Sequence, residues 1–124
     1  MNTQEIKQLV HDTVKIQARI IPSNIENLIQ EAFYFTAKQG AEKGAEENGL
    51  HLRALAKMDS DAIGKLAICV LVLSNGHTVI GEAICASLDP LDVTAGHRLA
   101  KLDAINKIWA LESYLLKQRL YELR

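Results

Sequence analysis

An Asn-Gly dipeptide at positions 75 and 76, set between two apolar runs, constrains the fold of this chain more than any other feature of its sequence. Asn-Gly between such runs is the strongest short-range signal for a β-hairpin, because both central residues of a type I′ turn need a positive φ and these two residues tolerate it. A two-residue loop here pairs Leu73 with Thr78. The sequence therefore predicts a β-hairpin over residues 66–87.

The predicted hairpin is apolar on both of its faces. With the two-residue loop, one face carries Val70, Val72, Val79, Ala83 and Cys85, and the other carries Leu71, Leu73, Ile80 and Ile84. A two-stranded ribbon with two apolar faces is not stable alone in water, so each face must be covered by helices of the chain or by a second copy of it. On this ground we expect a homo-oligomer.

Two residue types in the hairpin stand out from the apolar background. Glu82 either lies near the sheet edge, where it reaches solvent or a lysine, or is a partly buried carboxylate that receives a ligand hydroxyl or amine. The same register places Cys69 and Cys85 on opposite faces, so they cannot form a disulfide and we expect buried free thiols.

Length and composition narrow the function classes. A chain of 124 residues is expected to form a single domain over 1–124. The net charge of -1 and the lack of a basic block argue against a nucleic-acid-binding protein. No apolar stretch approaches the length of a membrane span and no signal peptide is recognisable, so we expect a cytoplasmic protein. The four histidines are scattered singly, which predicts no metal site and no cofactor.

The first half of the chain predicts helices, one short strand and a loose connection. Apolar residues at helical spacing indicate an N-terminal helix over 1–19, and a second helix that follows Pro22 with its stripe reaching Ile29 and Ala32. The aromatic run at 33–36 predicts a strand. Residues 37–64 lack an apolar period and are expected to form a partly mobile connection, with a brief helix over 51–58.

The C-terminal third predicts one long helix. Asp89 and Pro90 suit its start, with a helix proper from about Asp92, and two adjacent apolar rows make a face wide enough to cover one side of the hairpin. We therefore expect an α+β fold. Its small antiparallel β-sheet is built on the 66–87 hairpin, with the N-terminal helices and the long C-terminal helix packed on it, and residues 66–124 form the core.

A set of short motifs resembles a known family. The motifs are IPxxI at 21–25, YFTA at 34–37, CVLVLxNG at 69–76, GE at 81–82, CAS at 85–87 and NKIWxL at 106–111, followed by Tyr114. Together they resemble a family of small tailed-phage and prophage proteins, the phage gp forty-nine and gene sixty-six family. The resemblance implies a phage accessory protein that works in the host cytoplasm. Relatives usually carry Pro where Ala110 stands, so a straighter C-terminal helix is expected here.

Enzymatic catalysis is the function class that the sequence supports least. No nucleophile is paired with a recognisable base, and no glycine loop suits a phosphate. We therefore expect a non-enzymatic protein. The preferred hypothesis is counter-defence: binding and sequestering a nucleotide second messenger in a pocket at a subunit interface, by analogy with small phage proteins that do so.

Five residues are the candidate ligand-binding set: Tyr34, Glu82, His97, Arg98 and Lys101. Tyr34 can stack on a base, and Arg98 or Lys101 can pair with phosphate. The competing interpretation places the two cations on a solvated helix face and the tyrosine in the core. The alternative function is a protein-interaction module that inhibits or redirects a host protein, through helical anchors at Leu116, Leu120, Tyr121 and Leu123.

Overall fold

The computed structural model describes residues 2–8, 22–49 and 60–123. Residues 3–8 are helical, and Asn2 and Glu5 cap this turn reciprocally: the Asn2 Oδ1 atom accepts from the Glu5 N–H at 2.8 Å and the Glu5 Oε2 atom accepts from the Asn2 N–H at 3.0 Å. The rest of the predicted N-terminal helix and the brief helix predicted over 51–58 lie outside the described residues.

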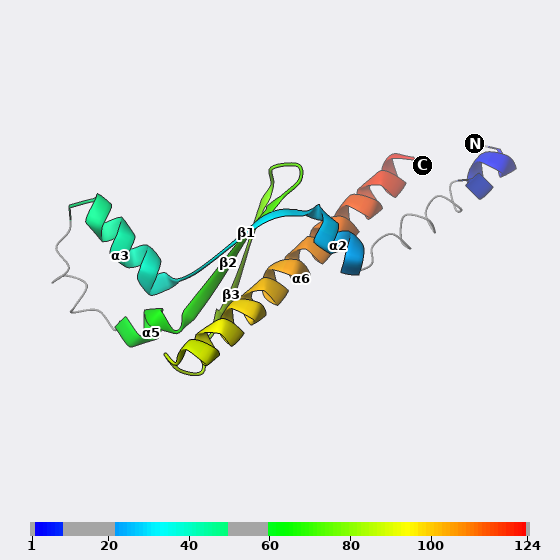
Figure 1. Ribbon diagram of the computed structural model, residues 1–124. Helices are drawn as coiled ribbons and strands as arrows, with labels where there is room; N and C mark the ends of the chain where they lie inside the picture. Colours follow the sequence, from blue (N-terminus) through cyan, green and yellow to red (C-terminus); the bar gives the residue numbers. More distant parts are fainter. Residues whose placement is uncertain (1, 9–21, 50–59, 124) are drawn as a thin grey trace.

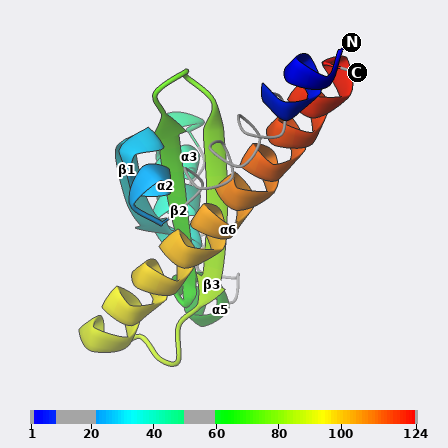
Figure 2. The same cartoon turned by 90° about the vertical axis from the view of Figure 1, so that its right-hand side faces the viewer.

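A three-stranded antiparallel sheet forms the centre of the described fold (Figure 1). Its strands are β1 (Ile29–Thr36), β2 (Leu66–Leu73) and β3 (Thr78–Ile84), in the order β1-β2-β3. Helix α6 (Pro90–Glu122) crosses one face of this sheet diagonally (Figure 2). The Asp89 Oδ1 atom accepts from the Leu91 N–H at 2.9 Å, which caps the helix as the sequence predicts. The α+β fold is confirmed.

The hairpin turn differs from the predicted one by one residue. The Leu73 N–H donates to the His77 carbonyl at 2.8 Å, and Thr78 faces Val72 instead of Leu73. Within the hairpin loop only Gly76 has a positive φ, of 88°, and the loop has three residues and ends in a glycine bulge. The Asn75 side chain stabilises this loop by accepting from the His77 N–H at 3.0 Å, which leaves Asn75 without the left-handed conformation that a type I′ turn needs.

This shift changes which side chains share a face, because side chains alternate along a strand. The face under α6, here called the covered face, carries Ala67, Cys69, Leu71, Leu73, Val79, Gly81 and Cys85. The opposite face, here called the open face, carries Ile68, Val70, Val72, Ile80, Glu82 and Ile84. The two cysteines therefore lie on the same face, contrary to the prediction, although both are buried and free as expected.

Small residues let α6 approach the sheet closely. Gly96, Ala100 and Ala104 follow one another at intervals of four along the helix and are buried. A Cβ atom on Gly81 of β3 would overlap the Ala100 carbonyl oxygen and lie 2.5 Å from the Ala104 nitrogen. The backbones of the helix and the strand are thus in contact here. Ile108, one turn further along α6, is fully buried against this core.

The strand β1 begins earlier than predicted. Helix α2 (Pro22–Leu28) ends at Leu28, so Ile29 and Ala32 belong to the strand and not to the helical stripe. The hairpin supplies the reason: the Ser74 N–H donates to the Leu28 carbonyl at 2.9 Å, and Ile29 pairs with Leu73 before a bulge. Pairing with β2 therefore overrides the helical pattern of these residues. Ile25 of α2 is 1% exposed and joins the core.

The predicted mobile connection over 37–64 is helical at both of its ends. Helix α3 (Ala37–Glu47) begins at a capping box, in which the Thr36 hydroxyl accepts from the Gln39 N–H and the Gln39 side chain accepts from the Thr36 N–H. Helix α5 (Ser60–Gly64) precedes β2. The capping box and the alanines of α3 favour a helix that needs no long apolar stripe, which explains why the apolar period did not reveal it.

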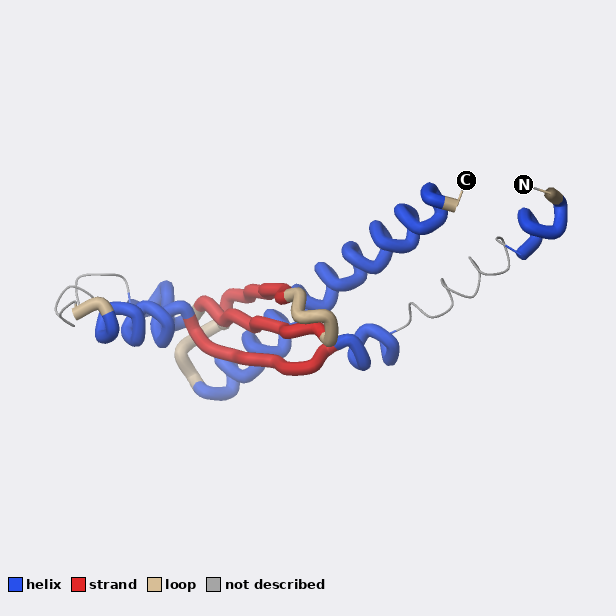
Figure 3. The backbone as a smooth tube through the Cα atoms, turned by 90° about the horizontal axis from the view of Figure 1, so that it is seen from above, coloured by secondary structure: helices blue, strands red, loops and turns tan. Residues whose placement is uncertain are grey.

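The open face stays largely uncovered in the described part of the chain. Phe33 is 51%, Ile80 54% and Ile84 80% exposed. Figure 3, a view from above, shows α6 on the far side of the sheet and α3 beyond one end of it. The second half of α6 extends past the sheet, where Tyr114 and Tyr121 are each 69% exposed (Figure 3). The helix runs unbroken through Ala110, as the missing proline predicts.

Candidate functional site

A pocket of about 550 Å³ lies where the first turns of α6 pass β1. Four of the five predicted ligand-binding residues line it: Tyr34, His97, Arg98 and Lys101. Four residues that the sequence did not single out complete the lining: Glu26, Thr94, Leu102 and Ile105. We call this the Tyr34 pocket. Residues far apart in the sequence thus meet in one concave site, as ligand pockets require.

The fold explains how these side chains meet. Tyr34 pairs with Cys69 across β1 and β2, so its ring lies on the covered face, toward α6. His97 and Lys101 are four residues apart on α6 and therefore lie on one side of the helix, with Arg98 beside them. Glu26 comes from α2, which packs against both β1 and α6. The local sequence around Glu26 gave no signal of a contact with Lys101.

The rings of Tyr34 and His97 are in contact at the base of the Tyr34 pocket. Their centroids are 5.6 Å apart and their planes make an angle of 61°, an edge-to-face arrangement. Tyr34 is 43% exposed, so part of its ring remains open to a ligand. The His97 Nδ1 atom is buried and has no hydrogen-bond partner among the described residues, which marks a polar atom that a ligand or a water can satisfy.

The two cations of the pocket differ in their surroundings. The Lys101 Nζ atom lies 3.5 Å from Glu26 Oε1, and its side chain is 32% exposed. Such partly exposed pairs contribute little to stability, so a phosphate can compete for the ammonium group. No carboxylate within the described ranges forms an ion pair with Arg98, whose guanidinium is exposed. Arg98 is therefore the cation most available to an anionic ligand.

Two titratable groups at the pocket, Tyr34 and Cys69, have raised pKa values. Burial raises the pKa of the Tyr34 hydroxyl, and the neighbouring Cys69 thiol raises it further. Burial likewise raises the pKa of Cys69, against the smaller opposing effects of Lys101 and of the hydrogen bond from Tyr34. A thiol held in its protonated form is a poor nucleophile. Burial therefore favours the protonated, less nucleophilic form of Cys69.

Glu82 does not belong to the Tyr34 pocket. It lies on the open face opposite Ile68 of β2 and is exposed. Its backbone N–H donates to the Asp103 Oδ2 atom at 3.0 Å. The interpretation of Glu82 as a solvent-exposed residue near the sheet edge is therefore right, and its interpretation as a partly buried carboxylate is wrong, because β3 turns its side chain away from α6.

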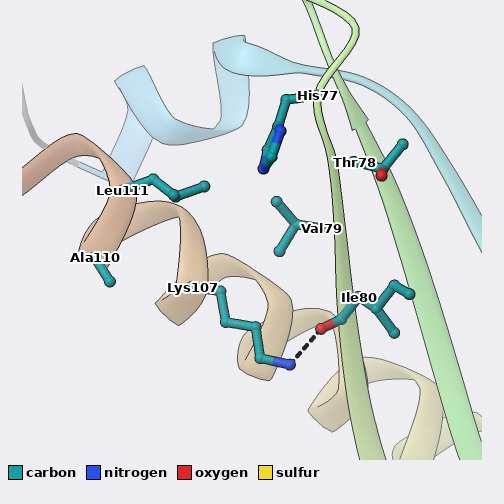
Figure 4. A pocket seen from close by; sticks show the side chains of 7 residues that line it. All are labelled: His77, Thr78, Val79, Ile80, Lys107, Ala110 and Leu111. Atoms are coloured by element: carbon teal, nitrogen blue, oxygen red, sulfur yellow. Dashed lines mark hydrogen bonds between the residues drawn. The ribbon is translucent and has the colours of Figure 1, made fainter. Parts of the chain in front are cut away.

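A second pocket, of about 460 Å³, lies on the far side of the sheet from β1, where α6 leaves the edge of β3 (Figure 4). Its lining is mostly apolar and consists of His77, Thr78, Val79, Ile80, Lys107, Ala110 and Leu111. The Lys107 Nζ atom donates to the Ile80 carbonyl at 2.5 Å, as Figure 4 shows. Lys107 also lies 3.7 Å from Asp103 Oδ2. Its ammonium group is thus already engaged, unlike the guanidinium of Arg98.

Within the described ranges, no three His, Cys, Asp or Glu side chains come together in a way that could hold a metal ion. Of the helices in these same ranges, none is both long enough and apolar enough to cross a membrane.

Comparison with known proteins identifies one family. Residues 20–120 match the family described as Phage protein (N4 Gp49/phage Sf6 gene 66) family. No curated protein and no solved structure is significantly similar to the chain. The match covers β1, the hairpin and most of α6, and therefore includes every residue that lines the Tyr34 pocket.

Proposed function

The chain belongs to the phage protein family of N4 Gp49 and phage Sf6 gene 66. We propose, from the lining of the Tyr34 pocket, that this phage accessory protein binds and sequesters a small nucleotide there. One observation carries the proposal: a half-exposed aromatic ring, an unpaired guanidinium and a second cation line the same concave site. An aromatic ring beside two cations matches a nucleotide, which joins a planar base to a negatively charged phosphate.

Each part of the pocket has a role in this proposal. The base packs on the accessible part of the Tyr34 ring, while Arg98 binds the phosphate with Lys101 at its side. The volume lies within the usual range of about 300–1,000 Å³ for small-molecule pockets. We propose sequestration and not turnover, and the raised pKa of the Cys69 thiol behind Tyr34 is in keeping with it.

Calorimetric titration with cyclic dinucleotides, cyclic trinucleotides and cyclic ADP-ribose isomers tests this function. We expect one class to bind, and Arg98→Ala to weaken that binding by about tenfold or more, since a hydrogen bond to a charged group contributes about 1.5–3 kcal/mol. Tyr34→Ala weakens it as well. Arg119→Ala and Tyr114→Ala, on α6 beyond the sheet, are the matched controls and leave the affinity unchanged.

Two results would contradict the proposal. If no member of the panel releases heat or shifts the melting temperature, nucleotide binding is wrong. If a nucleotide binds and Arg98→Ala leaves its affinity intact, the ligand lies elsewhere, and the Lys107 side of the molecule is the next place to look.

A protein-interaction module is the second candidate function. The observation in its favour is the far end of α6, where Tyr114 and Tyr121 are each 69% and Leu123 is 53% exposed. Leu116, one of the predicted anchors, is only 7% exposed and is not available to a partner. Tyr114→Ala combined with Tyr121→Ala should abolish capture of a host protein if this function is correct, without changing nucleotide binding.

A further inference from the structure

The two outer edges of the sheet differ in whether other parts of the chain bond to their backbone groups. At the β3 edge, two backbone groups are satisfied by α6: the Ile80 carbonyl by Lys107 and the Glu82 N–H by Asp103. These two helix residues also pair with each other at 3.7 Å. Side chains that occupy edge groups prevent another strand from adding there. The β3 edge is therefore closed.

Among the residues that the structure describes, none bonds to the outer edge of β1, as the hydrogen-bond pattern shows. Leu73 bonds to His77 and Lys65 to Cys85, so the odd residues of β2 direct their backbone groups toward β3. The even residues of β2 therefore bond to β1. Because Phe33 pairs with Val70, the odd residues of β1 bond to β2, and the backbone groups of Ala32 and Tyr34 point outward, away from the sheet. Neither backbone has a hydrogen-bond partner among the described residues.

We propose that β1 of a second copy pairs antiparallel with β1, and that this pairing completes the Tyr34 pocket. The strand pairing is independent of the proposed function, whereas the completion of the pocket rests on it. The register that joins the free groups places Ala32 opposite Tyr34 of the second copy, with Phe33 on the two-fold axis. Each of these two symmetry-related pairs exchanges both of its N–H···O bonds.

The side chains of β1 suit a second copy of the same strand. Phe33, which is 51% exposed, meets Phe33 of the second copy in a close aromatic cross-strand pair. Glu31 faces Phe35 of the second copy, so no like charges stand opposite each other. Figure 3 shows β1 as the outermost strand, with no other described element beside it at the level of the sheet. Opposite β1, a second copy therefore meets no like charge, and within the plane of the sheet no other described element lies beside β1.

The pairing matters for the pocket because the pocket opens beside the same strand edge. Tyr34 and Ala32 both lie on the covered face, toward α6. In the dimer, Ala32 of the second copy stands next to Tyr34 and forms a further wall of the pocket beside its ring. The two tyrosines become diagonal neighbours, about 7–8 Å apart at the backbone. Residues from both chains then enclose the ligand, which an isolated chain leaves open to solvent.

Substitution of Ala32 by proline tests the interface directly. Proline removes the outward N–H that bonds the second copy, and it is tolerated on an edge strand because the bonds to β2 do not involve this group. Light scattering should give twice the chain mass for the wild type and the chain mass for Ala32→Pro. Ala32→Val, which retains the N–H and suits a strand, is the matched control and remains dimeric.

Hydrogen exchange provides a measurement that does not depend on how the variant folds. The amides of Ala32 and Tyr34 should be protected in the concentrated wild type and lose this protection on dilution, while the Phe33 amide stays protected by β2. A wild type that is monomeric at concentrations of about 100 µM, or an Ala32→Pro variant that keeps the dimer mass, overturns the inference.

The outcomes for the interface and for the pocket can be distinguished. Nucleotide affinity should fall at least tenfold in Ala32→Pro and remain unchanged in Tyr114→Ala, on α6 beyond the sheet. If the wild type is a dimer that Ala32→Pro dissociates, but it binds no nucleotide, the interface is supported and the proposed function is refuted. If the wild type is a monomer that binds a nucleotide, the proposed function is supported and the proposed interface is refuted.

Discussion

The two faces of the sheet are built by alternate residues of the same strands, yet they carry side chains of different size. The covered face presents small residues, such as Ala67, Cys69 and Gly81, where α6 crosses it. The open face presents larger side chains, such as Ile68, Ile80 and Ile84. Both faces are apolar, so hydrophobicity did not decide which became the core. The closer approach that small residues allow to a helix decided it.

The largest expected effect comes from filling the narrowest point of the covered face. Gly81→Val introduces a side chain where the Ala100 carbonyl and the Ala104 nitrogen already stand, so α6 must move away from β3. We expect a loss of about 3 kcal/mol or more in the free energy of unfolding, measured by urea denaturation. Ile80→Val, next to it on the open face, is the control and should cost less than about 1 kcal/mol. Equal losses would contradict the contrast between the two faces.

A matched pair of isoleucines tests the same contrast by removing atoms. Ile108 is fully buried between α6 and the sheet, and Ile108→Ala should lower the free energy of unfolding by about 2–4 kcal/mol. Ile84 is 80% exposed on the open face, and Ile84→Ala should lower it by about 0.5 kcal/mol or less. If the two losses are similar in urea denaturation, the open face is covered in solution.

A smaller effect is expected at the closed strand edge. Lys107→Met keeps the aliphatic stem but removes the donor to the Ile80 carbonyl and the partner of Asp103. Because Ile80 and Lys107 are both exposed, water can replace the lost donor, and we expect a loss of about 0.5–1 kcal/mol in the free energy of unfolding. Lys117→Met, on α6 past the sheet, should have no measurable effect. A loss of several kcal/mol would mean that the edge bond is far less accessible to water.

The smallest effect concerns alkaline pH. The pKa values of Cys69 and Tyr34 are raised by burial above their ordinary values of 9.0 and 10.0, so the folded chain holds these protons to higher pH than the unfolded chain. Their stabilisation is complete below about pH 9 and is lost as the pH rises through the folded-state values. The melting temperature should therefore fall above pH 9, and Tyr34→Phe should reduce this slope. A flat profile from pH 8 to 11 would contradict the burial of these groups.

Sequence patterns located the main elements but not their exact alignment. Asn75-Gly76 placed the hairpin, and Asp89-Pro90 placed the start of α6. The single extra residue in the loop could not be predicted, because a type I′ turn and a three-residue loop with a glycine bulge both suit Asn-Gly and differ by small energies. That one residue changed which side chains share a face. It also explains why Cys69 and Cys85 lie on the same face.

The candidate site was predicted in part, for an identifiable reason. His97, Arg98 and Lys101 lie on one side of a well-capped helix, and helical spacing alone brings them together. Tyr34 could be predicted as well, because side chains alternate along β1 and Tyr34 therefore lies on the opposite face from Phe33 and Phe35. Glu82 did not join, because its face depends on the strand register. Glu26 was missed because its contact with Lys101 spans distant segments and left no local signal.

The backbone contact between α6 and β3 has a consequence for binding. Gly81 touches Ala100 and Ala104 without intervening long side chains, so the helix has no flexible layer on which to slide. His97, Arg98 and Lys101 belong to the same stretch of α6 and share this rigid frame. If the proposed ligand enters between them and Tyr34, its contacts with α6 are already in position, and it loses little affinity to ordering this helix. Enlarging Gly81 should therefore weaken binding at a site that Gly81 never touches.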